Sequence, residues 1–157
     1  MPELSNPPAA EAHASAGQPL EARKGLHKPL QKPEFHPFAD LIDLEFESVT
    51  PGSSRLALTL AEKHLNPNRV AHGAVAYALA DTGMGSALYA TLQAGEGCAT
   101  IEIKISYFKP VRLGRLVCKS SLINRAKTIG NLESRLYVDE VLVAHATGHF
   151  AILTARA

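Results

Sequence analysis

The sequence predicts an α+β fold in which an antiparallel sheet wraps around one long helix. Residues 74–92 are dominated by Ala and Leu and contain no run of β-branched residues, which is typical of a helix. The segments before and after it alternate apolar and polar side chains, which is typical of half-buried strands. Two strands, one long helix and four strands in this order indicate a helix packed on an antiparallel sheet.

The first 33 residues differ in composition from the rest of the chain. They hold six of the ten prolines, spaced among Ala, Ser, Glu and Gln. They contain no apolar stretch of the kind found in secretory signals, and their glutamates argue against a transit peptide. We interpret residues 1–33 as a flexible tail without a chemical role and residues 34–157 as one globular domain.

The strand predictions follow from short alternating segments that are separated by turn residues. Residues 41–49 alternate apolar and acidic side chains, and the turn at residues 51–53 leads into a second strand at residues 55–60. After the helix, four further strands are predicted at residues 99–108, 113–124, 132–139 and 141–153.

The predicted helix is apolar on almost every side, so a membrane-spanning segment has to be considered. Asp81 lies in its middle, where a charged side chain is costly in lipid, and the flanking segments alternate like those of a soluble sheet. We therefore reject a membrane span. A helix that is apolar all round is instead buried on most of its sides, as it is when a curved sheet surrounds it.

Composition and charge exclude several other classes of protein. The chain is 46% hydrophobic and 20% charged with a net charge of +1, so it lacks the basic character of a nucleic-acid-binding protein. Cys98 and Cys118 have no CxxC spacing and are expected to be reduced core thiols of a cytoplasmic protein. His145 and His149 share one face of a strand, but no neighbouring Cys or acid completes a metal site. We expect core or interface histidines and no metal.

Asp81 is the only charged residue between Gly73 and Gly95. A carboxylate in such apolar surroundings is costly unless it has a partner or a task. A structural aspartate, bonded to the backbone or to an arginine, is one explanation, and for a lone aspartate it is the more common one. The residues around the start of the helix favour the other explanation, which is a catalytic carboxylate.

Gly73 lies at the expected start of the helix, where an amide has no intrahelical acceptor and faces the positive end of the helix dipole. Because glycine has no side chain, a ligand can approach this amide closely, which suits a developing oxyanion. Asp81 follows eight residues later, roughly 12 Å along the helix axis. One carbonyl cannot contact both groups of one chain. If both act on one substrate, they come from two subunits with antiparallel helices in a two-fold dimer.

At this point the chain resembles a known family. Residues 72–74 (HGA) followed by residues 79–81 (LAD) resemble the HGG and LAD signature of hotdog-fold acyl-CoA thioesterases of the phenylacetic-acid-degradation type. The 4-hydroxybenzoyl-CoA thioesterases belong to the same superfamily. Residues 101–110 resemble the central strand of that family, residues 144–150 resemble its last strand, and the likeness covers about residues 36–153. It implies a hotdog fold, an acyl-CoA substrate and no separate cofactor. It also implies a homodimer that assembles to a tetramer.

The resemblance implies a role for each matching site residue. Asp81 corresponds to the carboxylate that acts as general base toward water or as nucleophile. Gly73 corresponds to the residue whose amide polarises the thioester oxygen, and Asn66 to an amide residue that positions water or the carbonyl. His72 corresponds to a supporting hydrogen-bonding histidine. Thr100 corresponds to a hydroxyl that orients the water, although an ordinary strand threonine fits this position equally well.

Two departures from the family pattern affect the expected site. Ala74 replaces the second glycine of HGG, which leaves the Gly73 amide in place and narrows the acyl pocket. Residues 125–130 replace a turn that contains Gly and Arg in the family, so the contacts to CoA are open there. Four basic residues are candidates for the CoA phosphates, and each one singly also fits a solvated surface charge: Lys109, Arg112, Arg125 and Lys127.

Two other functions remain as alternatives. A hotdog acyl-CoA hydratase or dehydratase would pair a histidine with the carboxylate. His72 cannot reach Asp81 on its own helix, but the pairing stays open across a dimer. A non-enzymatic acyl-CoA-binding protein is the second alternative, although the hotdog regulators carry a DNA-binding module and residues 1–33 show no helix-turn-helix pattern. The chain has no GxSxG motif, which excludes an α/β-hydrolase thioesterase.

Overall fold

The computed structural model of the protein describes residues 33–154. The predicted tail at residues 1–33 therefore lies outside the described residues, apart from Pro33. The helices and strands follow one another along the chain in this order: α1 (Pro37–Leu41), β1 (Glu45–Thr50), β2 (Ser53–Thr59), the 3-10 helix η1 (Glu62–His64), α2 (Gly73–Tyr89), β3 (Glu96–Tyr107), β4 (Arg115–Arg125), β5 (Ile129–Val138) and β6 (Val141–Thr154).

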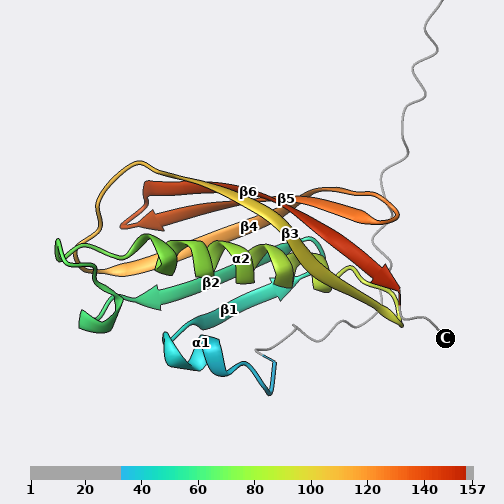
Figure 1. Ribbon diagram of the computed structural model, residues 1–157, viewed down its shortest axis with the longest axis horizontal. Coiled ribbons are helices and arrows are strands. Elements are labelled where there is room, and N and C mark those ends of the chain that lie inside the picture. Colours follow the sequence, from blue (N-terminus) through green and yellow to red (C-terminus); the bar gives the residue numbers. More distant parts are fainter. Residues whose placement is uncertain (1–32, 155–157) are drawn as a thin grey trace, which may run out of the picture.

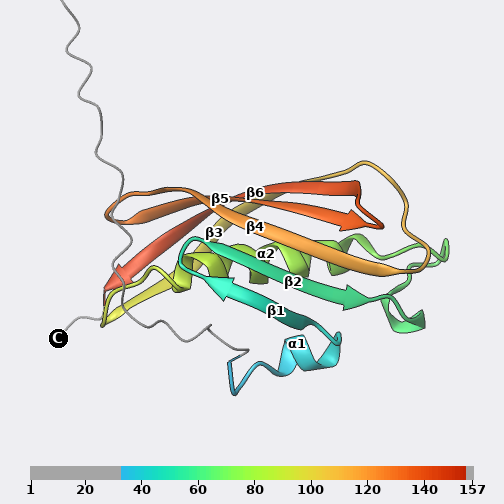
Figure 2. The ribbon, with the colours of Figure 1, turned by 180° about the vertical axis from the view of Figure 1, so that it is seen from behind.

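The six strands form one antiparallel sheet in the order β1-β2-β4-β5-β6-β3. The two edge strands of the sheet are thus β1 and β3. The sheet curls around α2, which lies in its concave side, and β3 crosses in front of the helix (Figure 1; Figure 2 shows the same from behind). The predicted fold class, an antiparallel sheet around one long helix, is confirmed.

The structure corrects the predicted boundaries before and after the helix. The segment expected as a strand from residue 41 begins as one only at Glu45, because α1 ends at Leu41 and Asp43 turns the chain with a φ of 52°. The helix ends at Tyr89 rather than at residue 92, since Thr91 donates its hydroxyl to the Leu88 carbonyl at 2.7 Å. Neither α1 nor η1 was predicted. Both are single turns, too short to show a helical period.

One side of α2 fills the core. Its buried side chains pack against the inward-facing residues of the sheet, and each fully buried leucine contributes roughly 1.5–3 kcal/mol to folding. The opposite side of α2 is not covered by this chain, and Tyr89 is 58% exposed there. The prediction of a helix buried on most sides therefore holds for the sheet side only. Large buried residues of the core include Leu56, Leu58, Leu79, Met84, Leu88, Leu116, Leu132, Leu136 and Phe150.

Three buried serines tie the middle of α2 to the sheet. Ser54 donates its hydroxyl to the Gly83 carbonyl at 2.7 Å, and Ser134 donates to the Ala80 carbonyl at 3.3 Å. The hydroxyls of Ser120 and Ser134 lie 2.7 Å apart and bond to each other. These bonds satisfy polar groups that would otherwise be costly to bury. They also fix the helical turns on both sides of Asp81, because the bonded carbonyls belong to residues 80 and 83.

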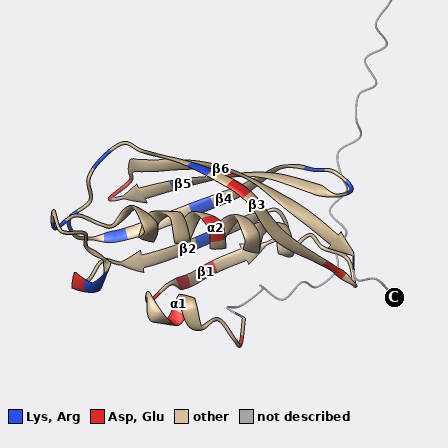
Figure 3. Cartoon of the chain, in the orientation of Figure 1, with Lys and Arg blue, Asp and Glu red and all other residues tan. Residues whose placement is uncertain are grey.

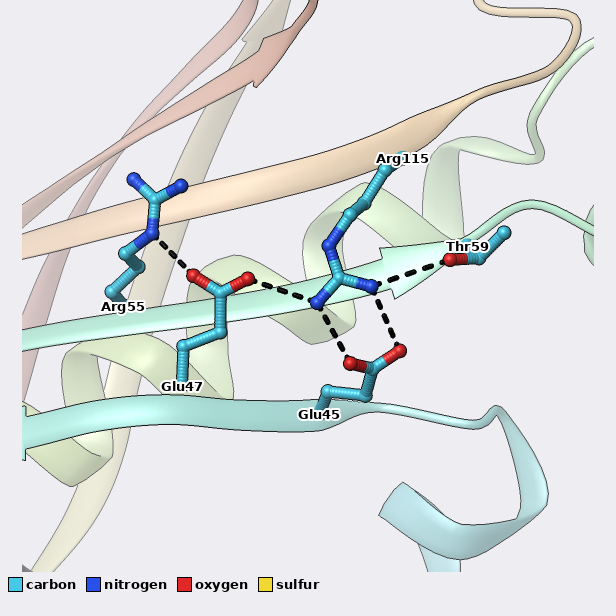
Figure 4. Close-up of polar contacts among 5 residues, drawn as sticks. All are labelled: Glu45, Glu47, Arg55, Thr59 and Arg115. Atoms are coloured by element: carbon cyan, nitrogen blue, oxygen red, sulfur yellow. Dashed lines mark hydrogen bonds and ion pairs between the residues drawn. The ribbon is translucent and has the colours of Figure 1, made fainter.

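A network of charges on the outer face of the sheet holds the edge strand β1 (Figure 4). Arg115 on β4 binds Glu45 through both guanidinium nitrogens, at 2.9 and 2.7 Å, and also binds Glu47 at 2.9 Å. Arg55 on β2 forms an ion pair with the second oxygen of Glu47. A two-pronged arginine–carboxylate contact is among the stronger surface interactions.

Replacing Arg115 with glutamine is expected to lower the free energy of unfolding at neutral pH by about 0.5–1 kcal/mol, since the network is exposed to solvent. Hydrogen bonds from Arg115 are the main cause that lowers the pKa of Glu45 and of Glu47 below the ordinary value of 4.5. A lowered folded-state pKa adds stability above the unfolded value, and this stability is lost as the pH falls through the folded-state value.

Urea unfolding of both proteins at about pH 7 and about pH 3 tests this expectation. The difference between Arg115→Gln and the native chain should shrink in acid. Lys104→Gln is a matched control, because Lys104 is an exposed sheet residue without an ion pair among residues 33–154. A difference that is the same at both pH values would contradict the assignment.

Candidate active site

The uncovered side of α2 forms one wall of a groove of about 700 Å³. The other walls come from the segment around α1, from β1, from the edge strand β3 and from Phe150 on β6. Most of the lining is apolar, with a few polar side chains near the middle. The lining residues are Pro33, His36, Phe38, Phe46, Val49, Ala78, Asp81, Thr82, Gly85, Ser86, Tyr89, Cys98, Ala99, Thr100 and Phe150.

Asp81 and Thr100 meet in this groove. The Thr100 hydroxyl donates to Asp81 Oδ1 at 2.8 Å, and this is the only hydrogen bond that the Asp81 side chain makes within residues 33–154. A bulge between Thr100 and Glu102 makes this contact possible, since an extra residue shifts which side chains point inward. The carboxylate is partly exposed, so its remaining lone pairs face the groove. Thr100 therefore contacts the candidate carboxylate directly through its hydroxyl.

Cys98 lines the same groove and is only half-buried, whereas Cys118 is fully buried in the core. The expectation of a core thiol is thus right for Cys118 and wrong for Cys98. Burial, and then the negative charge of Asp81, raise the pKa of Cys98 above 9.0. The thiol stays protonated at neutral pH and is a poor nucleophile. Burial likewise raises the pKa of Cys118 to about 11.

A second pocket, of about 320 Å³, lies at the start of α2. His72 caps the helix: its Nδ1 accepts from the Ala74 amide at 3.0 Å and its carbonyl accepts from the Val75 amide at 2.9 Å. The Gly73 amide, in contrast, donates to no acceptor within the described part of the chain. Lining residues are Val70, Ala71, His72, Gly73, Ala76, Tyr107, Phe108, Lys109, Pro110, Val111, Leu116, Val143 and Ala144.

Tyr107 was not singled out in the sequence, yet it closes one side of this second pocket. Its hydroxyl donates to the Gly73 carbonyl at 2.9 Å. Burial raises the pKa of Tyr107, so the phenol remains a donor at neutral pH. A β-carbon added at Gly73 would lie 3.1 Å from this hydroxyl. A side chain at position 73 would thus require the Tyr107 ring to shift by a few tenths of an ångström.

Four of the five predicted catalytic residues line one of the two pockets, and the fifth, Asn66, lines neither. Thr100 is brought to Asp81, and His72 is brought to Gly73, but the two groups line different pockets. Asn66 lines neither pocket. Its side-chain oxygen accepts from the amides of Asn68 and Val70, at 2.9 and 3.3 Å, and so shapes the loop that leads into α2.

The four basic candidates lie in or beside two connections between strands, and Figure 3 shows blue segments, which mark Lys and Arg, near both ends of α2. Lys109 lines the second pocket and Arg112 is exposed in the same connection, between β3 and β4. Lys127 is exposed in the connection between β4 and β5, at the far end of α2. Arg125 lies next to that connection, where its guanidinium binds Glu96 at 2.6 Å. A single chain therefore cannot bring all four to one ligand.

The histidines of β6 lie on the outer face of the sheet, where each of them has an acidic neighbour. His145 contacts Glu133 at 3.1 Å, and His149 lies 3.6 Å from Glu102. These acids come from neighbouring strands, so their proximity is not visible in the linear sequence. His149 is also exposed, which excludes a core role.

Within residues 33–154 no three His, Cys, Asp or Glu side chains are grouped to hold a metal ion, and no helix there is long and apolar enough to cross a membrane.

Comparison with known families bears on this geometry, because the matched segment contains residues of both pockets. Residues 68–145 match the thioesterase superfamily. The matched thioesterase segment contains Gly73, Asp81, Thr100 and Tyr107. It ends before the last residues of β6.

Two curated proteins are similar over part of the chain. One of them, from Saccharolobus solfataricus, has a name that provisionally describes an esterase. It is 30% identical to this chain over 90 residues, which are 57% of this chain and 59% of that protein. The similarity thus spans less than two thirds of that relative. The other, from Pseudomonas aeruginosa, has the same kind of provisional esterase name and is 28% identical over 96 residues, which are 60% of this chain and 72% of that protein.

Solved structures confirm the hotdog fold. A conserved protein from Pseudomonas aeruginosa is 26% identical with a TM-score of 0.73, covering 76% of this chain and 95% of that one. A mutant of a phenylacetic acid degradation protein from Thermus thermophilus is 24% identical with a TM-score of 0.71, covering 75% of this chain and 100% of that one. At this identity the second likeness shows the fold alone.

Proposed function

We propose that the protein hydrolyses acyl-CoA thioesters, in sites that two subunits of a homodimer form together. One observation supports this most strongly. A carboxylate with a hydroxyl partner and an unpaired amide at a helix start both face open pockets, as ester hydrolysis requires. They are nevertheless eight residues apart on one helix, roughly 12 Å. A second chain is needed to bring them to the same carbonyl.

The uncovered side of α2 supports a two-fold dimer. The small side chain of Ala74, which is exposed, would let a second helix lie close by, and Ile101 on the edge strand β3 is 56% exposed. If the two helices run antiparallel, Gly73 of each subunit lies near Asp81 of the other. The same arrangement places the Lys109 end of one subunit beside the far end of the other. The two groups of basic residues then flank one site, as the phosphates of CoA require.

The proposed reaction uses these groups as follows. The thioester oxygen accepts a hydrogen bond from the Gly73 amide, and the dipole of α2 stabilises the negative charge that develops on this oxygen. Asp81 either takes a proton from the attacking water or attacks the carbonyl carbon itself, and Thr100 holds its carboxylate in place. In the first route the carbon–sulfur bond breaks and Asp81 returns the proton of the water to the sulfur, so that CoA leaves as the thiol and the acyl group as the carboxylic acid. In the second route the carbon–sulfur bond breaks as the Asp81 anhydride forms and CoA leaves as the thiolate. Water then hydrolyses the anhydride to the carboxylic acid and the free Asp81 carboxylate, and the proton released goes to the thiolate.

Measuring free CoA thiol release from a panel of short, long and aryl acyl-CoAs tests the proposal. We expect hydrolysis of at least one substrate, with CoA thiol released in step with the free acid. Sedimentation of the native protein should show a dimer or a multiple of it. If the native protein cleaves none of the thioesters faster than a heat-inactivated sample does, the proposed hydrolase activity is wrong.

One observation favours a hydratase as the second candidate. His36 lines the same groove as Asp81, and a hydratase needs a histidine beside its carboxylate. However, His36 Nδ1 accepts from the Ala39 amide at 3.2 Å and caps α1, so only Nε2 is available. Hydration of an enoyl-CoA without thiol release would select this candidate over the thioesterase.

A further inference from the structure

Two glycines lie inside α2, at positions 83 and 85. Glycine in a helix interior is less stable than alanine, so each one needs a reason. The two positions differ in what a side chain would meet. At Gly83 an added β-carbon would overlap the buried hydroxyl of Ser120. Packing against the sheet therefore explains Gly83.

Packing does not explain Gly85. A β-carbon built there would have one neighbour within 4 Å, Phe150 Cε1 at 3.7 Å, which is an ordinary contact distance. The backbone of Gly85 is helical and shows no positive φ that would demand glycine. An alanine would thus fit and would favour the helix. The protein nevertheless leaves this volume empty.

The empty volume lies beside the candidate carboxylate. Gly85 follows Asp81 by four residues, so both occupy the same face of α2. Side chains of a helix tilt toward its N-terminus, and a side chain at position 85 would therefore lean toward Asp81. Gly85 also lines the 700 Å³ groove together with Phe46 and Phe150. The space that glycine preserves is where the first atoms of an acyl group would lie.

We infer that Gly85 sets the width of the acyl groove next to Asp81 and admits acyl groups that are bulky beside the thioester carbon, such as a ring or a branched chain. This inference rests on the proposed thioester site. A straight chain is narrow near the carbonyl and does not need the space. A ring or a branch does, and the aromatic side chains of Phe46 and Phe150 provide apolar walls for it.

The test compares the native protein with Gly85→Ala on butanoyl-CoA, 2-methylpropanoyl-CoA and benzoyl-CoA. The substitution should lower kcat/KM for the branched and ring substrates by about 10-fold or more relative to butanoyl-CoA. At the same time it should raise the melting temperature by roughly 2–4 °C, because alanine favours the helix. Gly97→Ala is the matched control, since it adds the same methyl group with no atom within 4 Å and outside the groove lining.

Binding separates this inference from the proposed function. Calorimetry with S-butyl-CoA and S-benzyl-CoA, which cannot be hydrolysed, should show the same selective loss of affinity for the bulky ligand in Gly85→Ala. A selective loss without any hydrolysis would support the groove and overturn the thioesterase. Parallel changes for all ligands, or none, would overturn the role of Gly85 even if the native enzyme is active. Weaker dimerisation of Gly85→Ala without a change in substrate selectivity would also overturn this role. It would show that the space beside Gly85 is occupied by the α2 helix of the second subunit.

Discussion

Replacing Asp81 with asparagine is expected to lower kcat for thioester hydrolysis by about 10²–10⁴-fold, since the variant loses its proton-accepting or nucleophilic group. Asparagine has nearly the same shape, and its side-chain oxygen can still accept from the Thr100 hydroxyl that now lies 2.8 Å from Asp81. Substrate should therefore bind almost as before. Removing a partly buried charge should leave stability unchanged or slightly increased.

Steady-state kinetics with the best substrate of the panel, together with thermal unfolding, measures both effects. Asp139→Asn provides a matched control, because it makes the same chemical change in the exposed turn between β5 and β6. The φ of Asp139 is 47°, a conformation that asparagine also adopts readily. Equal kcat values for Asp81→Asn and the native protein would show that Asp81 is only structural.

Removing the amide hydrogen of Gly73 is expected to have a comparable effect, about 10²–10³-fold on kcat, which is typical for one oxyanion donor. Gly73→Pro achieves this with little damage to the fold. Proline is favoured at the first position of a helix, and the preceding residue, His72, already has the extended backbone that proline requires, with a ψ of 135°.

Gly73→Ala is the control for this variant. Both substitutions add a β-carbon 3.1 Å from the Tyr107 hydroxyl, but only proline deletes the N–H group. The loss beyond that of Gly73→Ala therefore measures the replacement of the N–H group by the proline ring, which removes the donor and fills its place. If the two variants are equally active, the amide does not stabilise the oxyanion.

Mixing the two inactive proteins tests whether a site uses two chains. In a heterodimer of Asp81→Asn with Gly73→Pro, one site combines an intact Gly73 with an intact Asp81, and the other site carries both defects. Co-refolding equal amounts should thus restore about a quarter of the native activity, because half of the dimers are mixed and each has one working site. A mixture that contains heterodimers, as shown by differently tagged chains, but stays inactive would place each site within one chain.

Much of the fold could be predicted because its signals are local. The alternation of the strands and the Ala-rich helix gave the order of elements, and the confirmed curl of the sheet follows from an apolar helix. The two groups of the proposed site are also visible in the sequence, since Gly73 marks a helix start and Asp81 is a lone charge. Their separation follows from the rise of a helix alone.

What could not be predicted depends on contacts between distant segments. The bulge that turns Thr100 toward Asp81 leaves no mark in the sequence pattern, and Tyr107 reaches Gly73 from 34 residues away. In the sequence Arg125 resembles a free cation, but Glu96 at the start of β3 binds it. The acids beside His145 and His149 likewise come from adjacent strands.

The buried serines beneath α2 bear on how this scaffold could be altered. They hold the carbonyls before and after Asp81 from the sheet side, while the acyl groove lies on the opposite side of the helix. The two sides are therefore separate engineering targets. Changes to α1, to Phe46 or to Gly85 should alter which acyl group is accepted without displacing Asp81. Changes to the serines should alter the position of Asp81 for every substrate alike.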